Sequence, residues 1–148
     1  MYFPDNASYS YGLPRSLPGV ECIGWLEPSH EFRKKKQDDL FLRKLLKLTR
    51  RESVNKMRGI HHCPFCGDLE IRLEEGRFLL GHAELWVPGN RRDVLFVAPN
   101  LIYHYCDKHD YEPPREFVEA VLAFDFDSEW SGVVEADKRI DALYAEDE

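Results

Sequence analysis

Two thiols at a short, fixed spacing constrain the fold of this chain more than any other feature. Cys63 and Cys66 enclose a Pro-Phe pair and precede a glycine, a composition typical of a tight knuckle that directs two thiolates at one point. Soft thiolates at that spacing suit a tetrahedral zinc ion. Thioredoxin-type redox proteins also use a Cys-x-x-Cys pair, but theirs opens a helix in a βαβ setting, whereas this pair precedes a predicted hairpin. The setting therefore favours a metal site.

Two histidines later in the chain supply the expected second half of the site. His104 and His109 have four residues between them, within the spacing of about three to five that is typical of paired histidine ligands. Positions five apart diverge on a regular helix, so we expect His109 just past the end of a helix. Two thiolates also neutralise the ion, which allows the site to be buried. The predicted zinc ligands are Cys63, Cys66, His104 and His109.

A zinc ion held by four protein side chains has no open position for water or substrate, which indicates a structural rather than a catalytic ion. Four further residues are alternative ligands: His61, His62, His82 and Cys106. His61 lies two residues before the first thiol, where a side chain more often hydrogen-bonds to a ligand than binds the metal. Cys106 faces away from His104 on a helix, so we expect it in the core.

A histidine and a glutamate in a predicted strand form a candidate acid–base pair. His82 and Glu84 lie two positions apart, so their side chains share one face of a strand. Beside a metal such a pair can transfer protons, although an exposed cross-strand contact is the favoured interpretation. Several aromatic side chains can line a groove, but we expect core packing for them. These are Trp86, Tyr103, Tyr105 and Tyr111.

Length and composition place the chain in the range of one globular domain. With 148 residues, of which 43% are hydrophobic and 32% charged, it can bury roughly 70% of the surface that its unfolded chain exposes. We expect a single domain over 1–148, with an irregular arm at 1–19, where Gly and Pro recur without periodicity.

Hydrophobic periodicity predicts the order of the elements. Alternating or β-branched runs predict strands at 20–26, 69–73, 78–87 and 94–97. Helical spacing predicts helices at 37–50, 101–109, 115–124 and 134–144, with Asn100 as the N-cap of the second. The expected fold class is α+β, a small antiparallel β-meander with flanking helices around a treble-clef-like zinc site.

Charge and hydropathy limit the compartment and the partners. No cationic segment precedes an apolar run at the N-terminus, and no apolar run reaches the ~18 residues that span a bilayer. We therefore expect a cytoplasmic protein with reduced cysteines and no membrane partner. The net charge is −7, but the stretch 31–58 holds eleven Lys/Arg against four Asp/Glu, and 107–148 holds four against fourteen. Solvated faces are the favoured explanation of this polarity.

Short motifs extend beyond the ligand pairs. They are Ile23-Gly24-Trp25-Leu26, Arg58-Gly59-x-His61-x-Cys63-x-x-Cys66, Gly81-x-Ala83-Glu84, Ala98-Pro99-x-Leu101-Ile102-x-His104-Tyr105 and His109-x-Tyr111-x-Pro113-Pro114-x-x-Phe117. Over about residues 20–124 the chain resembles a family of small uncharacterised bacterial cytosolic proteins. The resemblance supports the ligand assignment and implies no activity.

Three functions of different classes compete. The first is a non-enzymatic, zinc-stabilised domain that binds another protein, as an accessory or immunity-type partner does. The second is a metal-dependent nuclease or other hydrolase, against which the negative charge and the filled zinc shell count. Its candidate groups are His61, His62, His82 and Glu84. The third is nucleic-acid binding through the basic stretch 33–58, which would weaken steeply with salt.

Overall fold

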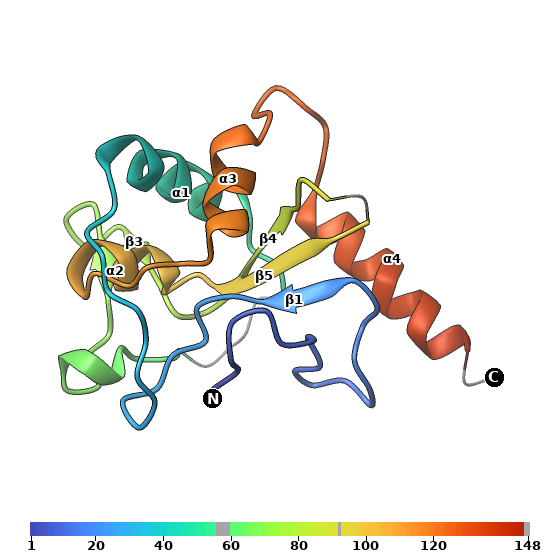
Figure 1. The fold of residues 1–148 in the computed structure, drawn as a ribbon, viewed down its shortest axis with the longest axis horizontal. Helices are drawn as coiled ribbons and strands as arrows, with labels where there is room; N and C mark the ends of the chain where they lie inside the picture. The colour runs from blue at the N-terminus through green and yellow to red at the C-terminus, as the bar shows by residue number, and fades with distance from the viewer. Residues whose placement is uncertain (56–59, 92, 147–148) are drawn as a thin grey trace.

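The computed structural model describes residues 1–55, 60–91 and 93–146 (Figure 1). These residues form an α+β fold of four helices and two small sheets. The elements are β1 (Val20–Cys22), α1 (Asp39–Arg51), the 3-10 helix η1 (Pro64–Cys66), β2 (Arg72–Leu73), β3 (Phe78–Leu79), β4 (Glu84–Pro88), β5 (Leu95–Pro99), α2 (Ile102–Lys108), α3 (Arg115–Ala123) and α4 (Gly132–Ala145). All four predicted helices form, each within two residues of its predicted bounds. In this described part, no helix is long and apolar enough to cross a membrane.

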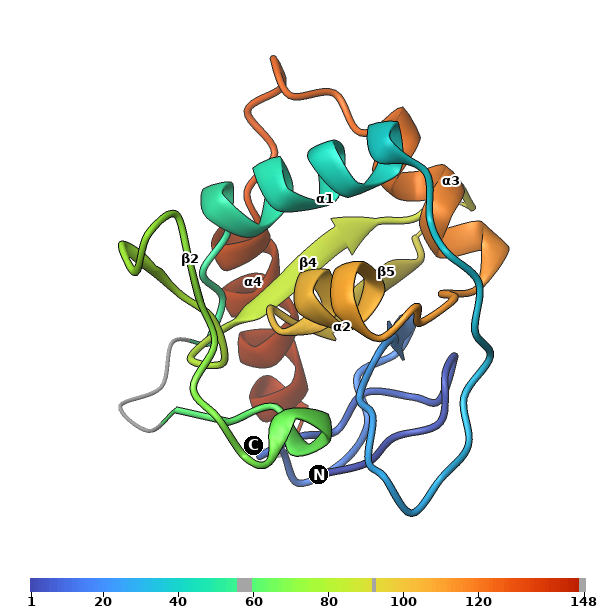
Figure 2. The ribbon, with the colours of Figure 1, turned by 90° about the vertical axis from the view of Figure 1, so that its left-hand side faces the viewer.

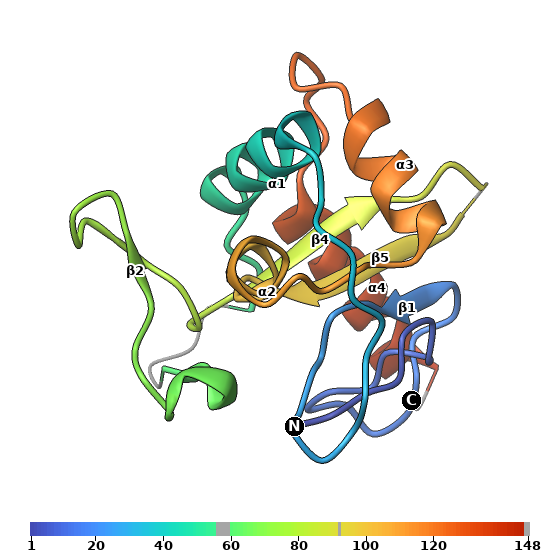
Figure 3. The same ribbon diagram turned by 60° about the vertical axis from the view of Figure 1, so that its left-hand side comes forward.

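The strands form two sheets, so the prediction of one antiparallel meander is wrong. β5 pairs antiparallel with β4 and parallel with β1, which makes the larger sheet mixed, in the order β1-β5-β4. β2 and β3 form a separate antiparallel hairpin, which extends away from the larger sheet in Figure 3. The strand predicted at 78–87 breaks because Gly81 has a φ of +97°, which no strand residue adopts.

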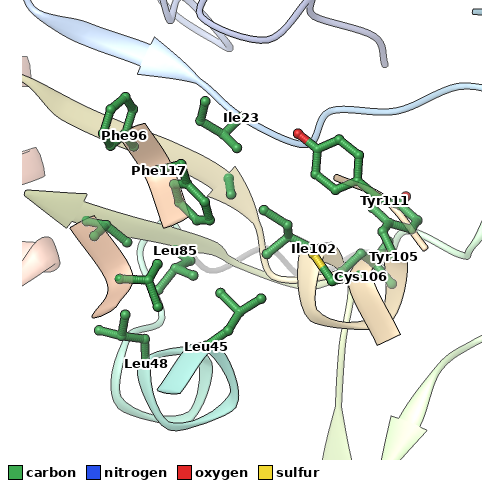
Figure 4. Close-up of a cluster of buried hydrophobic side chains, with 14 of the residues drawn as sticks. Ile23, Leu45, Leu48, Leu85, Phe96, Ile102, Tyr105, Cys106, Tyr111 and Phe117 are labelled. Carbon is green, nitrogen blue, oxygen red and sulfur yellow. The ribbon is translucent and has the colours of Figure 1, made fainter. Parts of the chain in front are cut away.

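Helices cover both faces of the larger sheet. Figures 1 and 2 show α1, α2 and α3 on one face and α4 on the other. On the first face the three helices contribute Leu45, Ile102 and Phe117 to a core that they share with Leu85 and Phe96 of the strands (Figure 4). Each of these side chains is at most 1% exposed. This core fixes α2, and with it two of the predicted ligands.

The N-terminal segment and α4 share a second core on the opposite face. Residues 1–19 form no helix and no strand ladder, but Tyr9 and Leu17 from this segment are fully buried. They belong to the same cluster as Trp86 of β4 and Leu143 of α4. The segment is therefore irregular in its backbone and still part of the hydrophobic core.

The basic side of α1 holds the segment between α3 and α4. The Arg51 guanidinium donates hydrogen bonds of 2.8 to 3.0 Å to three backbone carbonyls, those of Phe126, Ser128 and Trp130. It also lies 5.1 Å from the centroid of the Phe124 ring. The sequence suggested that the basic side of α1 is solvated, but its Arg51 instead holds the loop between α3 and α4.

Replacing Arg51 with methionine is expected to lower the free energy of unfolding by about 2 kcal/mol, because the apolar stem stays while three hydrogen bonds and a cation–π contact are lost. Urea unfolding measures the change. Arg43→Met on the same helix, where Arg43 pairs with the exposed Asp39, should cost less than about 0.5 kcal/mol. Equal costs for the two variants would show that Arg51 does not hold the loop.

Candidate metal centre

The two thiols lie on a knuckle that η1 forms. The carbonyl of Cys63 accepts hydrogen bonds from the N–H groups of Cys66 and Asp68, at 3.2 and 3.1 Å. Pro64 begins the 3-10 turn, and Gly67 ends it with a φ of +68°, which glycine adopts without strain. The Pro-Phe and Gly composition noted in the sequence therefore builds the turn that brings the two thiols together.

The two histidines come from α2 and its C-terminal end. His104 lies within the helix and is 7% exposed. His109 is the C-cap residue, and its N–H donates to the Tyr105 carbonyl at 3.1 Å. The N–H of Tyr111 donates to the same carbonyl, also at 3.1 Å, so the chain folds back at the helix end. The prediction that His109 lies just past the helix is confirmed.

Four donor atoms from the knuckle and α2 meet at one point. The ligand atoms of Cys63, Cys66, His104 and His109 all lie within 4.8 Å of one another. The two histidine Nε2 atoms are 3.2 Å apart, and Cys66 Sγ lies 3.4 and 3.3 Å from them. Zinc bonds of about 2.0 Å to nitrogen and 2.3 Å to sulfur give tetrahedron edges of about 3.3 Å for N–N and 3.5 Å for N–S. The spacing of the donors therefore matches a four-ligand metal site.

Burial sets the protonation of these donors. Burial and the neighbouring His109 lower the pKa of His104 to about 4, and burial lowers the pKa of His109 as well. Both imidazoles are then neutral at pH 7 and present a lone pair. Burial raises the pKa of the Cys63 thiol to about 11. A metal ion that binds this thiolate replaces a proton, so metal binding is coupled to pH.

The alternative ligands lie outside this cluster of the described residues. Cys106 is 1% exposed in the first core, as predicted. His61 and His62 are exposed just before the knuckle, and His82 lies in a bend that precedes β4. Of the four aromatics expected to pack in the core, Trp86, Tyr105 and Tyr111 are buried there, and Tyr103 packs partly buried against it. The four residues named first from the sequence are thus the ones that the fold brings together.

Glu84 does not form the exposed contact with His82 that its sequence position suggested. It is 2% exposed, and its carboxylate accepts hydrogen bonds from three side chains: Tyr9 at 2.6 Å, Asn55 at 2.7 Å and Trp86 at 3.1 Å. The expectation failed because the predicted strand breaks before Glu84, which then begins β4 against the second core. No sequence pattern links Tyr9 to a residue 75 positions away.

The buried Glu84 carboxyl makes stability depend on pH. Burial raises the pKa of Glu84 from its usual 4.5, against three hydrogen bonds that lower it. The folded state therefore binds this proton more tightly than the unfolded state does. The stability that proton binding contributes is fully present below pH 4.5 and is lost as the pH rises through the folded-state pKa. Glu84→Gln should gain stability relative to the parent as the pH rises above 4.5, measured by urea unfolding. A pH-independent difference would contradict this assignment.

Asn100 connects the two halves of the site instead of capping α2. Its Oδ1 accepts a 2.6 Å hydrogen bond from the Gly81 N–H, and the residue is 1% exposed. The helix begins after Leu101 without a side-chain cap. The Gly81 carbonyl in turn accepts a 2.7 Å bond from the N–H of His61, two residues before the first thiol. This chain of bonds sets the position of the knuckle relative to α2.

The fold and the donor cluster define a small α+β protein with a Cys2His2 set that can bind a metal ion. The chain belongs to the family described as Domain of unknown function (DUF7919), whose model matches residues 1–122. No curated protein and no solved structure matches it. The matched part includes all four donor residues and ends before α4. Arg58 and Gly59 of the sequence motifs lie outside the described residues.

Proposed function

We propose that this protein is a zinc-stabilised, non-enzymatic domain that binds another protein in an accessory or immunity-type role. The closed donor cluster carries the proposal. Its members are Cys63, Cys66, His104 and His109, whose ligand atoms lie within 4.8 Å of one another. Four protein ligands fill a tetrahedral shell and leave no position for a reacting water.

Zinc is the metal that this donor set favours. Two sulfur and two imidazole donors at tetrahedral spacing are typical of structural zinc, whereas Mg²⁺ and Ca²⁺ prefer oxygen ligands. The two thiolates neutralise the ion, which supports burial of the site. A knuckle, a hairpin (β2–β3) and a later helix with two ligands (α2) follow in the order of a treble-clef-like site, with β4 and β5 between the hairpin and the helix.

α4 provides the surface that we assign to the partner. It lies on the face of the larger sheet opposite α2 (Figure 2). Val133, Val134 and Tyr144 on this helix are 43%, 65% and 49% exposed. The stretch 107–148 carries fourteen acidic residues against four basic ones. A partner with an apolar centre and a basic rim would complement this surface.

Affinity capture with zinc-loaded protein as bait, in extract of the native host, tests the proposal. One partner should be enriched by the parent chain, and its recovery should fall about tenfold with the double variant Val134→Glu and Tyr144→Ala, which changes exposed side chains only. Zinc content and thermal unfolding of the variant serve as controls. Enrichment of no protein, or equal recovery with both baits, would contradict the proposal.

A metal-dependent nuclease or hydrolase is the first alternative. Its candidate groups lie in different environments. Glu84 accepts three hydrogen bonds in the core, whereas His61 and His62 are exposed near the knuckle. Nucleic-acid cleavage that disappears in His62→Ala, while zinc stays bound, would replace the proposed function with this one.

Nucleic-acid binding through 33–58 is the second alternative, and positions 56–58 of it lie outside the described residues. Part of this basic charge is used within the protein. Lys44 Nζ donates to the Leu122 carbonyl at 2.7 Å, and Arg51 donates to three carbonyls. Retention on heparin that falls steeply with salt would favour this alternative.

A further inference from the structure

A cavity of about 460 Å³ opens beside the metal cluster, a size within the range of about 300 to 1,000 Å³ for small-molecule sites. The neighbours of the donor residues form one side of it. His61 and His62 precede the knuckle, Pro64 lies between the two thiols, and Tyr105 follows the first histidine donor. The element that binds the metal therefore also shapes this cavity.

Another part of the lining is apolar and held in place. The ring centroids of Tyr11 and Trp25 are 5.6 Å apart, and the Trp25 indole N–H donates to the Val97 carbonyl at 3.0 Å. Leu26 and Leu101, which also line the cavity, are 8% and 2% exposed. An aromatic and aliphatic wall held in this way suits a planar ring.

One hydroxyl group of the lining residues has no partner within the protein and is left for a ligand. Tyr105 lines the cavity and is only 4% exposed. Its ring is held edge-on by Phe65, with centroids 5.8 Å apart. Within 1–55, 60–91 and 93–146, the Tyr105 hydroxyl forms no hydrogen bond. Because the hydroxyl oxygen is not among the buried unpaired atoms, it is accessible, and it can donate a hydrogen bond to an acceptor atom placed beside it.

The charges of the lining favour an uncharged ligand. Of the described residues that line the cavity, none is Lys or Arg, and the Glu27 carboxylate is paired at 3.3 Å with the Met1 ammonium, which also lines the cavity. We propose that this cavity binds an uncharged small molecule with a planar ring and a hydrogen-bond acceptor, which the Tyr105 hydroxyl meets as donor. The site is separate from the partner surface on α4, which contributes no residue to the described lining.

Fluorescence titration of the zinc-loaded protein with prodan, an uncharged naphthalene that carries a ketone, tests this site. Saturable one-to-one binding with blue-shifted emission is expected. Tyr105→Phe keeps the ring and removes only the hydroxyl, and should weaken binding about fivefold. Ser29→Trp, at an exposed position of the lining, should block binding. Lys138→Trp, at an exposed position of α4, is the matched control and should bind like the parent.

Zinc content and circular dichroism establish that each variant is folded before it is titrated. Absence of saturable binding to the parent overturns the proposal, as does equal affinity of Ser29→Trp and Lys138→Trp. Unchanged affinity in Tyr105→Phe overturns the role of the hydroxyl. Tighter binding of the anionic probe anilinonaphthalene sulfonate overturns the uncharged class. Since these measurements use no protein partner, their failure leaves the proposed function standing.

Discussion

Replacing Cys66 with serine is expected to remove bound zinc and to lower the Tm by about 20–40 °C. Structural zinc in small domains contributes on the order of 10 kcal/mol of apparent binding free energy, which is also folding free energy, and 1 kcal/mol corresponds to about 2–4 °C in a chain of this size. Cys66 is half-buried, so the change removes little packing. Elemental analysis and thermal unfolding followed by circular dichroism measure both effects.

Cys106→Ala is the matched control for this variant. Cys106 lies on α2 like His104, but it is buried in the first core and is not among the four clustered donors. It should keep one zinc per chain and lose about 1–2 kcal/mol to the smaller side chain. A Cys66→Ser protein that keeps its zinc would contradict the ligand assignment. One that loses zinc but unfolds like the parent would contradict the structural role.

The second large effect is expected at Gly81, where alanine should lower the free energy of unfolding by about 3 kcal/mol or more. An added Cβ would stand 2.1 Å from the carbonyl oxygen of His61, and the φ of +97° disfavours any side chain. Gly81 also accepts a hydrogen bond from the His61 N–H and donates one to Asn100, so the clash displaces the segment that leads into the first thiol. Zinc affinity should therefore fall together with stability.

Gly76→Ala separates the cost of the positive φ from the cost of the clash with His61. Gly76 has a similar φ of +87°, but an added Cβ would meet nothing within 4 Å. It should cost only the backbone strain, about 1 kcal/mol. Urea unfolding of both variants, with zinc affinity by competition against a chelator, gives the comparison. Equal costs would show that the close approach of Gly81 to His61 does not constrain the site.

The donor set was predictable because it depends on local spacing. The Cys-x-x-Cys pair and its Pro and Gly residues determine the knuckle within a few positions, and the end of α2 determines where His109 lies. The helices were predictable for the same reason, since their apolar spacing repeats within each segment.

The sheet and the polar core were not predictable, because they depend on partners far apart in the chain. β1 pairs with β5 across more than seventy residues, and Glu84 finds Tyr9 across a similar distance. Gly81 carries a local signal, since an isolated glycine in a strand pattern indicates a break or a close approach. The hydrogen bond between Gly81 and Asn100, however, could be recognised only from the folded structure.

X-ray absorption at the zinc edge, on protein purified without added chelator, tests the central claim most directly. One zinc per chain is expected, with two sulfur neighbours at about 2.3 Å and two nitrogen neighbours at about 2.0 Å. This shell corresponds to Cys63, Cys66, His104 and His109 and has no place for water. A shell with an oxygen ligand, or with fewer than two sulfurs, would contradict the closed structural site.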